Sequence, residues 1–351
     1  MDEALELQGL LPDGLVTGLA ARGVSLAPAQ ARRVFAHVVG RGRPLAELPR
    51  IRQAHREALA RHTRCRRLDV VEVAEDEDGF IKWLLRCPDG ALTEAVRIPL
   101  DKPGRYSVCL SSQVGCAMRC DFCATGRLGL SRSLDAWEMV AAWAAVRDAT
   151  DDGRVTSAVF MGQGEPFHNY DAVLEAAAIL SHPNGGGIAQ KAITISTVGL
   201  IPQMRRYTRE GHRYRLIVSL HSADARVRRE LLPVAGQLDL EDLVRAIAEH
   251  AEATGQMVPV AWTLMAGVND DPAEVERLSA LLGDTRVIVN LIDVNDPRPD
   301  GYRRSPRLEA FRDALAAAGL PMRRRYSGGR GRDAACGMLA AIRQAKHEPV
   351  R

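Results

Sequence analysis

Three cysteines stand within eight residues of one another, in the order Cys116, Cys120 and Cys123. Thiolates are the usual protein ligands of iron–sulfur clusters, and three of them leave one iron of a four-iron cubane open to a further ligand. The main alternative is a zinc site, which normally takes a fourth cysteine or histidine at a characteristic spacing. None follows in the next stretch, which reads ATGRLGLSRSL. The spacing therefore predicts a [4Fe-4S] cluster on this loop.

Two further cysteines stand in settings that favour reactivity. Cys109 shares one face of a short apolar segment with Ser107 and Ser111, a polar face that suits the mouth of a barrel. Cys336 lies in the stretch GGRGRDAACG, where neighbouring arginines favour the nucleophilic thiolate. A cysteine is more often an inert buried side chain, so the residues alone leave both readings open. Cys65 and Cys87 are interpreted as structural.

The elements that must position these residues alternate between strand and helix from Gly104 onward. Strand patterns cover residues 105–112, 155–162, 192–199, 214–221, 258–265 and 286–293, and helical periodicity marks residues 133–149, 170–182, 239–255 and 271–284. Ser133 or Asp135 could cap the first of these helices. The alternation predicts parallel β/α units, either as an open doubly wound sheet or as a barrel. Periodicity does not choose between the two.

The first hundred residues have a different texture. Residues 1–60 read as amphipathic helices, and residues 61–101 as short strands joined by Asp-Gly turns. Arginines gather in residues 41–67, 298–307 and 323–332, where they could bind phosphates or form a solvated surface.

Composition sets the class of protein. The 351 residues carry a net charge of +3 and are 46% hydrophobic, an ordinary globular balance. No apolar run approaches the roughly 20 residues that cross a bilayer, and the N-terminus lacks the basic start of a signal peptide. We therefore expect a cytoplasmic protein, in which a framework of structural disulfides is disfavoured.

The sequence resembles the radical S-adenosylmethionine (SAM) superfamily in the CxxxCxxC loop that follows the first barrel strand. Within the superfamily it resembles the RlmN/Cfr family of RNA (adenine-carbon) methyltransferases over nearly the whole chain. The motifs that carry this likeness are EAVRIP at 94–99, CLSSQVGC at 109–116, MGQGEP at 161–166, SLH at 219–221, VND at 268–270, NLI at 290–292 with Asn295, and DAACG at 333–337. The resemblance implies an α/β fold with a partial (β/α)6 radical SAM barrel over residues 102–335. A small helical domain over 1–60, with possible RNA contact, and a β-rich bridge over 61–101 would precede it, and a C-terminal segment over 336–351 would follow.

The resemblance also implies a role for each matched residue. Contacts with SAM would fall on Gly164, Glu165, Ser196, Ser219, Leu220, His221 and Asn295. Cys336 would carry the methyl group as S-methylcysteine, and Glu94 would accept a proton. Cys109 would then resolve a protein–RNA crosslink through a transient disulfide with Cys336.

The implied activity is methylation of an adenine ring carbon, carbon 2, in 23S rRNA and tRNA. Adenine ring carbons are too electron-poor to attack the methyl group of SAM, and a radical route removes this mismatch. Implied cofactors are one [4Fe-4S] cluster and two SAM molecules per turnover. Implied partners are RNA and an electron donor such as flavodoxin or ferredoxin, with the chain acting as a monomer and without a membrane.

Three departures from the family pattern bear on the substrate: Gln163 stands in place of a common Met, Val198 in place of a Ser, and Ala261 in place of a Glu. A Cfr-like carbon-8 methyltransferase, or a paralogue with another substrate, therefore stays open. A second alternative is a non-catalytic iron–sulfur module that binds RNA. Such a module would not require the catalytic glutamate and the two reactive cysteines together.

Overall fold

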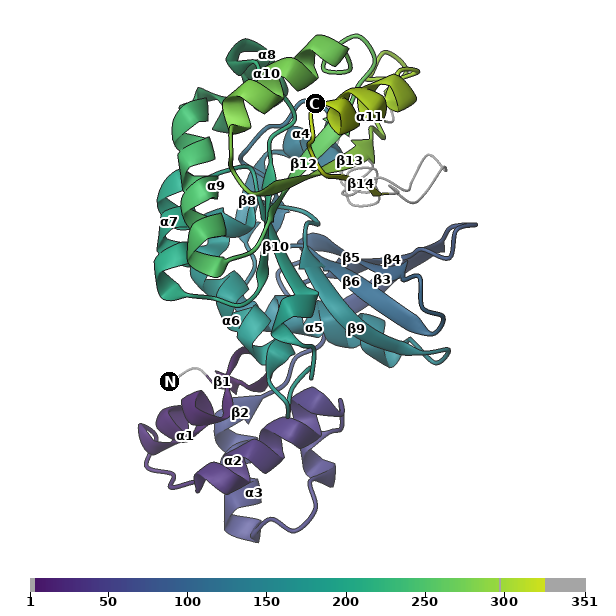
Figure 1. Ribbon diagram of the computed structural model, residues 1–351. Coiled ribbons are helices and arrows are strands. Elements are labelled where there is room, and N and C mark those ends of the chain that lie inside the picture. Colours follow the sequence, from purple (N-terminus) through teal and green to yellow (C-terminus); the bar gives the residue numbers. More distant parts are fainter. Residues whose placement is uncertain (1–3, 297, 326–351) are drawn as a thin grey trace.

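The computed structural model describes residues 4–296 and 298–325 of the chain. A ten-stranded sheet runs through the molecule (Figure 1). The strand order is β14-β13-β12-β11-β10-β9-β6-β5-β4-β3. Its parallel strands are β6 (Arg105–Leu110), β9 (Arg154–Phe160), β10 (Ile193–Thr197), β11 (Arg215–Ser219), β12 (Val258–Leu264), β13 (Val287–Asp293) and β14 (Met322–Arg325). The six predicted strands are confirmed, and β14 is an addition. Within the described residues β3 and β14 are the free edges, so the sheet is open, as a partial barrel requires.

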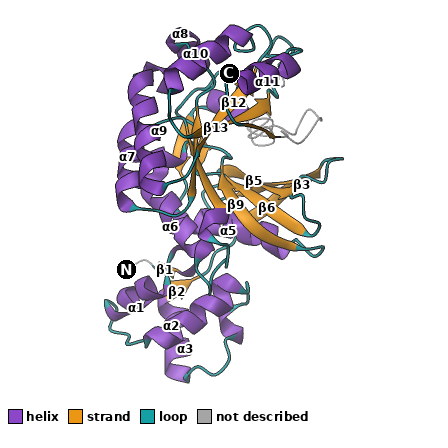
Figure 2. Cartoon of the chain, in the orientation of Figure 1, coloured by secondary structure: helices purple, strands orange, loops and turns teal. Residues whose placement is uncertain are grey.

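Helices cover one face of this sheet (Figure 2). They are α5 (Ala136–Asp148), α6 (Tyr170–Ser181), α7 (Ile201–Glu210), α9 (Leu240–Thr254), α10 (Pro272–Leu282) and α11 (Leu308–Ala317). Helix α5 follows Asp135, whose backbone N–H donates to Oε2 of Glu138 at 2.8 Å. The capping position is therefore Asp135 and not Ser133. Trp143 of α5 is among the largest fully buried side chains, which fixes this helix against the sheet.

Alternate residues of each strand point away from the helices, and we call their side the inner face. Val108 and Leu110 belong to the main core, whereas Cys109 between them does not. Alternation along each strand and the pairing between strands place the following residues on the inner face: Lys82, Glu94, Val96, Cys109, Val159, Thr194, Ser196, Arg215, Ile217, Ser219, Asn290 and Arg323. This face is more polar than the apolar face that packs on the helices.

The segment expected as a bridge continues the same sheet. Strands β3 (Asp69–Glu75), β4 (Ile81–Arg86) and β5 (Leu92–Pro99) pair antiparallel with one another, and β5 pairs antiparallel with β6. Gly79 and Gly90 adopt φ values of 77° and 88° in the two connecting turns, a conformation that glycine allows without strain. Residues from this segment therefore reach the inner face directly.

A separate helical unit precedes the sheet. Helices α1 (Pro12–Ala20), α2 (Pro28–Phe35) and α3 (Gln53–His62) share a small core that includes Leu19, Val34 and Leu59. Strands β1 (Leu5–Glu6) and β2 (Thr63–Arg64) close it as a parallel pair. Within the described ranges, no helix is long and apolar enough to cross a membrane.

Shorter elements complete the fold. They are α4 (Ala124–Leu128), α8 (Ala225–Leu231), β7 (Gln113–Gly115), β8 (Leu130–Ser133), and the single-turn helices η1 (Leu7–Gly9), η2 (Ala36–Gly40), η3 (Leu45–Glu47), η4 (Pro166–Asn169), η5 (Gln190–Ala192) and η6 (Ala235–Gln237). Strands β7 and β8 form a hairpin on either side of the cysteine loop and α4.

Candidate radical SAM site

The cysteine loop is held by its backbone. The N–H of Cys116 donates to the carbonyl of Gly129 at 2.7 Å, and the N–H of Asp121 donates to the carbonyl of Leu231 at 3.0 Å. Gly115 has a φ of 75°, and a Cβ there would lie 1.9 Å from the oxygen of Gly129. Only glycine fits this close approach of two chain segments. The loop is thus fixed between the β7–β8 hairpin and the end of α8.

The three thiols of the loop lie together within one cluster of mostly apolar side chains. Cys116 and Cys120 are buried and Cys123 is half-buried, in a cluster that also contains Met265 and Val294. Burial raises the pKa of Cys116 to about 12 and that of Cys120 well above its usual value, and for Cys120 the charges of the other two thiols act in the same direction. Cluster binding releases such thiol protons, because only the thiolate is a ligand.

This donor set fits an iron–sulfur cluster. Each thiolate of a cubane binds a different iron, so the sulfurs need not converge on one point. Accordingly, in the part of the chain that the structure describes, no three Cys, His, Asp or Glu side chains are placed to hold a single ion. The N–H of Met118 lies 3.5 Å from Sγ of Cys116 and donates to it, a contact of the kind that orients metal ligands.

A buried arginine accompanies the thiols. Arg228 of α8 is 1% exposed and donates to the carbonyls of Ala235 at 2.7 Å and Val198 at 2.8 Å. Burial lowers its pKa to about 10, whereas the nearby Cys120 raises it. Sequence analysis missed this residue, because the segment ARVRREL reads as an ordinary exposed helix. It places a positive charge beside ligands that are anionic when they bind metal.

Glu165 lies at the end of β9 and is oriented by backbone groups. Its Oε1 accepts from the N–H of Phe167 at 2.9 Å, and its Oε2 accepts from the N–H of Val198 at 2.9 Å. Burial raises its pKa to about 7 in spite of these hydrogen bonds. A carboxylate held in this way can accept from the ammonium group of SAM.

Gln163 supplies an independent sign that a polar group belongs here. Its side chain is 1% exposed, and neither its Oε1 nor its Nε2 has a hydrogen-bond partner among the described residues. Leaving a buried amide unsatisfied costs about 1–3 kcal/mol for each group. Because it stands two residues before Glu165, a ligand as polar as SAM could satisfy it. The residues present therefore fit this cofactor.

His221 has an unusual backbone that its neighbours hold in place. Its φ is 62°, its carbonyl accepts from Nδ2 of Asn269 at 2.7 Å, and its Nδ1 accepts from the N–H of Thr263 at 3.0 Å. Burial, aided by the charge of Arg228, lowers the pKa of His221 to about 3. The ring is therefore neutral, and since Nδ1 accepts a hydrogen bond, Nε2 carries the proton. Asn269 was missed as a functional residue, although it lies inside the VND motif.

The remaining residues expected at SAM occupy the ends of neighbouring strands. Ser196 and Ser219 lie on the inner face near the carboxyl ends of β10 and β11, and Asn295 follows β13. The Leu220 side chain is fully buried in the main core on the helix side. Only the backbone of Leu220 can face the inner side. The carboxyl ends of parallel strands meet at one edge, where barrels collect their sites.

Glu94 and Cys109 share the inner face on adjacent strands. Cys109 pairs with Val96, two residues along β5 from Glu94, so the carboxyl and the thiol are diagonal neighbours, about 7–8 Å apart at Cα. The carbonyl of Glu94 also accepts from Oγ of Ser111 at 2.7 Å. Sequence analysis missed Lys82, whose Nζ lies 3.8 Å from Oε2 of Glu94. Cys336 lies outside the described residues, and no disulfide joins two of the six cysteines that the structure describes.

Some of the arginines proposed for RNA contact are engaged in local contacts. Arg56 donates to the carbonyls of Ala46 and Leu48, and Arg298 is paired with Asp296 at 2.6 Å. These two side chains therefore stabilise local structure, which makes them poor choices for phosphate contacts. The expectation that residues 41–67 contact RNA stays a prediction.

The comparisons with known proteins decide the family. The sequence profile of the radical SAM superfamily matches residues 110–282. The dual-specificity RNA methyltransferase RlmN of Syntrophobacter fumaroxidans is 40% identical over 325 residues, which cover 91% of this chain and 94% of that protein. The chain belongs to the RlmN family of radical SAM RNA methyltransferases.

Other comparisons agree with this assignment. A probable RNA methyltransferase of Anaeromyxobacter sp. (strain Fw109-5) is 48% identical over 329 residues, covering 92% of this chain and 96% of that protein. The crystal structure of a radical SAM methyltransferase from Sphaerobacter thermophilus has a TM-score of 0.85 at 35% identity, covering 95% of this chain and 98% of that one. As a member of the RlmN family, this protein is a SAM-dependent enzyme of a superfamily that implies an iron–sulfur cluster. The alternative of a non-catalytic RNA-binding module is thereby wrong.

Proposed function

We propose that this RlmN-family enzyme methylates carbon 2 of an adenine in 23S rRNA and in tRNA, through a methyl group carried on Cys336. The observation that supports this most directly is the placement of Glu94 and Cys109 on adjacent strands of the inner face. A site for ordinary methyl transfer would need neither a second thiol nor a base beside it.

The cofactors set the frame for this chemistry. One [4Fe-4S] cluster on Cys116, Cys120 and Cys123, together with SAM, supplies the radical chemistry that joins a carbon to an electron-poor ring. Glu165, the Nε2–H of His221 and the amide of Gln163 would orient SAM beside the cluster. Two SAM molecules would be used per turnover, and a flavodoxin or ferredoxin of the cytoplasm would supply electrons.

The protein residues perform the remaining steps. Cys336 accepts the methyl group, and Glu94 removes the proton from the ring carbon once the carbon of Cys336 is bonded to it. The thiolate of Cys109 then attacks the sulfur of Cys336, so that a disulfide forms and the bond between that sulfur and the transferred carbon breaks. The electron pair of that bond leaves with the carbon, which takes up a proton and becomes the methyl group of the product. The buried ion pair with Lys82 holds Glu94 on the face where this exchange takes place.

The test compares single cysteine variants of the full-length, reconstituted enzyme. Cys336→Ala should keep its iron and transfer no methyl group. Cys109→Ala should accumulate RNA covalently attached to protein, visible as a nuclease-sensitive shift on a denaturing gel. Cys65→Ala is the matched control, because Cys65 is an exposed thiol away from the site, and it should behave as the parent enzyme.

Two outcomes would contradict the proposal. The methyl-carrier mechanism does not operate if Cys109→Ala and Cys336→Ala are both inactive without an adduct, or both fully active. Digestion of the product RNA to nucleosides, followed by mass spectrometry, identifies the methyladenosine isomer. If the product is 8-methyladenosine, the enzyme is the Cfr-like carbon-8 methyltransferase and the assignment to carbon 2 is wrong.

A further inference from the structure

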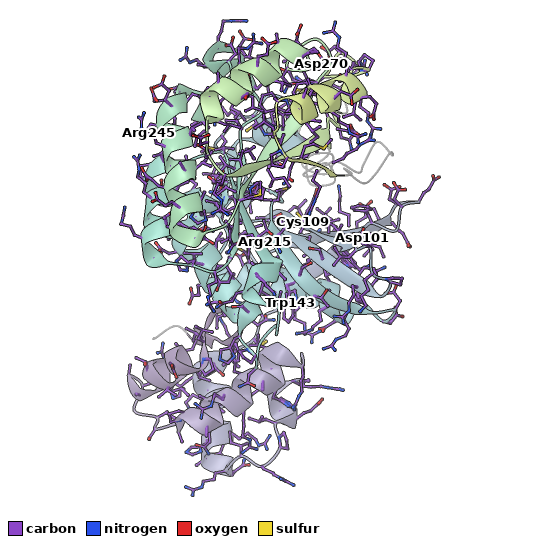
Figure 3. All side chains as sticks on the ribbon, in the orientation of Figure 1. Asp101, Cys109, Trp143, Arg215, Arg245 and Asp270 are labelled. Carbon is purple, nitrogen blue, oxygen red and sulfur yellow. The ribbon has the colours of Figure 1, made fainter. Side chains whose placement is uncertain are left out.

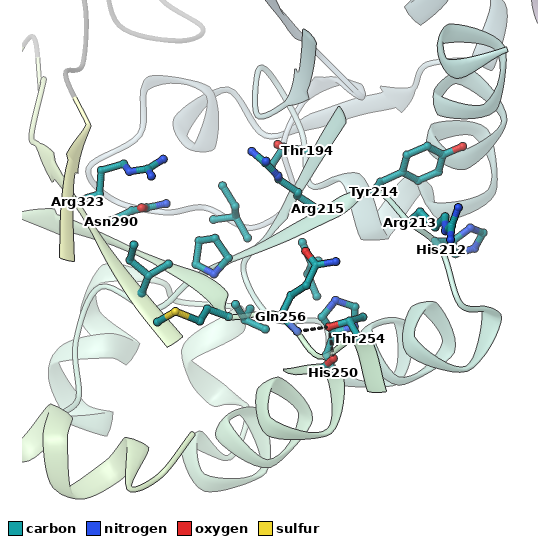
Figure 4. A pocket seen from close by; sticks show the side chains of 16 residues that line it. Thr194, His212, Arg213, Tyr214, Arg215, His250, Thr254, Gln256, Asn290 and Arg323 are labelled. Carbon is teal, nitrogen blue, oxygen red and sulfur yellow. Dashed lines mark hydrogen bonds between the residues drawn. The ribbon is translucent and has the colours of Figure 1, made fainter. Parts of the chain in front are cut away.

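A second cavity opens at the opposite ends of the strands from the cysteine loop. It has a volume of about 250 Å³ and is lined by residues in the first halves of β10 to β14, by the segment that follows α7 and by the end of α9 (Figure 4). Thr194, Arg215 and Arg323 stand at the starts of β10, β11 and β14. This cavity is thus distinct from the site around Glu165 and His221, which lies at the carboxyl ends.

The cavity carries positive charge without a partner. Arg213, Arg215 and Arg323 line it, and none of their side chains makes a hydrogen bond or ion pair with any residue in the described ranges. None of the described lining residues is acidic. The side chains of Arg215 and Arg323 extend toward one another, with Thr194 beside the first and Asn290 beside the second (Figure 4). By contrast, His212 is bound to Glu210 at 2.7 Å and is not available.

This combination selects an anion with several acceptor oxygens. Guanidinium groups bind phosphate oxygens through parallel hydrogen bonds, and hydroxyl and amide groups can satisfy the remaining oxygens. The lining also contains apolar side chains such as Ile217 and Ile288, but its charged side chains are cationic. A phosphate group therefore matches both the charge and the donors.

The register of the sheet relates this cavity to the catalytic residues. Cys109 pairs with Val159, Val159 with Thr194, and Thr194 with Arg215, so these four residues form one row across β6, β9, β10 and β11. All four belong to the inner face, and Figure 3 labels both Cys109 and Arg215 on the sheet. With strands about 4.8 Å apart, the Cα of Arg215 lies about 14 Å from that of Cys109 along the sheet. An RNA strand with one base at Cys109 has its backbone within reach of the cavity.

We propose that the cavity between Arg215 and Arg323 binds a backbone phosphate of the RNA substrate, next to the target adenosine. The inference rests on the proposed function, because it takes Cys109 as the position of the target base. It assigns the cavity a task in positioning the RNA and none in the chemical step. The phosphate of a free nucleotide has the same chemistry, and the experiment separates the two sources.

The experiment measures RNA affinity and methylation for the cluster-loaded, full-length enzyme. The double variant Arg215→Ala/Arg323→Ala is compared with Arg209→Ala/Arg229→Ala, which removes two exposed arginines outside the cavity lining. For the cavity variant, KM and Kd for an unmodified RNA fragment should rise at least about tenfold, with kcat at saturating RNA nearly unchanged. The slope of log K against log salt should become shallower by about 0.7, the contribution of one phosphate on a single strand. The control variant should change neither quantity, and RNA-independent SAM cleavage and the thermal unfolding midpoint should match the parent in both.

Each result decides between the possibilities. Unchanged KM and salt slope in the cavity variant, with normal methylation by the parent, overturn this inference and leave the proposed function standing. A parent enzyme that neither binds nor methylates RNA overturns the proposed function itself. Adenosine monophosphate is the probe for the other source. If it binds the parent but not the cavity variant, and does not compete with RNA, the cavity is a nucleotide site and the inference is wrong.

Discussion

Nζ of Lys82 lies 3.8 Å from Oε2 of Glu94, and both side chains are almost completely buried, with exposed fractions of 6% and 3%. They lie on neighbouring antiparallel strands, where Lys82 pairs with Val96, two residues from Glu94. Charges in such a setting are kept because each compensates the other, and removing one of them costs stability. The carboxylate is thus fixed by a cation that comes from outside the barrel.

The first prediction concerns this pair. Lys82→Met should lower the free energy of unfolding by about 3 kcal/mol, because breaking a buried pair costs about 3–5 kcal/mol. Lys82→Arg should keep most of the stability and of the methylation rate. Urea unfolding measures the first quantity and RNA methylation the second. A Lys82→Met protein as stable as the parent would show that the pair contributes nothing.

The second prediction concerns Asn269, which donates from Nδ2 to the carbonyls of His221 at 2.7 Å and Thr263 at 2.8 Å. In Asn269→Ala these buried carbonyls lose their donor, so His221 should leave its φ of 62°. SAM affinity should fall about tenfold, which corresponds to about 1.4 kcal/mol. Calorimetric titration of the cluster-loaded protein with SAM measures it, and Asn184→Ala is the control. Parental SAM affinity with reduced stability would make Asn269 purely structural.

The third prediction compares two glycines with positive φ. Gly164 has a φ of 100°, and a Cβ there would lie 2.6 Å from Cβ and Cγ of Gln113, whereas Gly187 has a φ of 63° and nothing within 4 Å. Gly164→Ala should therefore lower the unfolding free energy by about 3 kcal/mol, the upper end for local strain. Gly187→Ala should cost about 1 kcal/mol, since only the backbone conformation is unfavourable. Equal losses in urea unfolding would mean that the contact with Gln113 is relieved without cost.

The fourth prediction concerns pH. Burial lowers the pKa of His250 to about 4 and that of His221 to about 3. Below pH 6.5 both histidines take up protons in the unfolded chain but stay neutral in the folded chain. Their contribution to the free energy of unfolding is therefore fully present above pH 6.5 and is lost as the pH falls toward 4. By pH 5 the loss should be about 2 kcal/mol for each histidine. In His250→Gln, the loss of unfolding free energy between pH 7.5 and pH 5 should be smaller by the contribution of one histidine. Urea unfolding at pH 7.5, 6 and 5 measures it. An identical pH dependence in the variant would refute the assignment.

The main strands could be predicted because each is an apolar segment bounded by polar turns. β14 could not, since its sequence MRRR contains one apolar residue and the strand exists only through its pairing with β13. Its partner is remote in the chain, so no local pattern marks it. That the β-rich segment over 61–101 continues the main sheet could not be predicted for the same reason, because the pairing of β5 with β6 is a tertiary contact.

The candidate site shows a similar division. The cysteine loop could be found from residue types and spacing, and Gly164 and Glu165 from the resemblance, but Arg228 and Lys82 could not. Both are cations with exposed fractions of 1% and 5%, and sequence favours an exposed position for such residues. Their burial follows from what packs around them, namely the cysteine loop for Arg228 and Glu94 for Lys82.

The hairpin between β5 and β6 sets where this chain can change in length. Its turn spans residues 100–104 and is closed by the bond from the N–H of Leu100 to the carbonyl of Arg105, at 3.0 Å. Insertions in this exposed turn leave the ladder untouched, so relatives of different loop length can keep the same chemistry. One extra residue between Glu94 and Pro99 would instead turn the carboxylate away from the inner face toward the apolar core on the helix side. The turn over residues 100–104 can therefore change in length during evolution, whereas the segment from Glu94 to Pro99 must keep its number of residues.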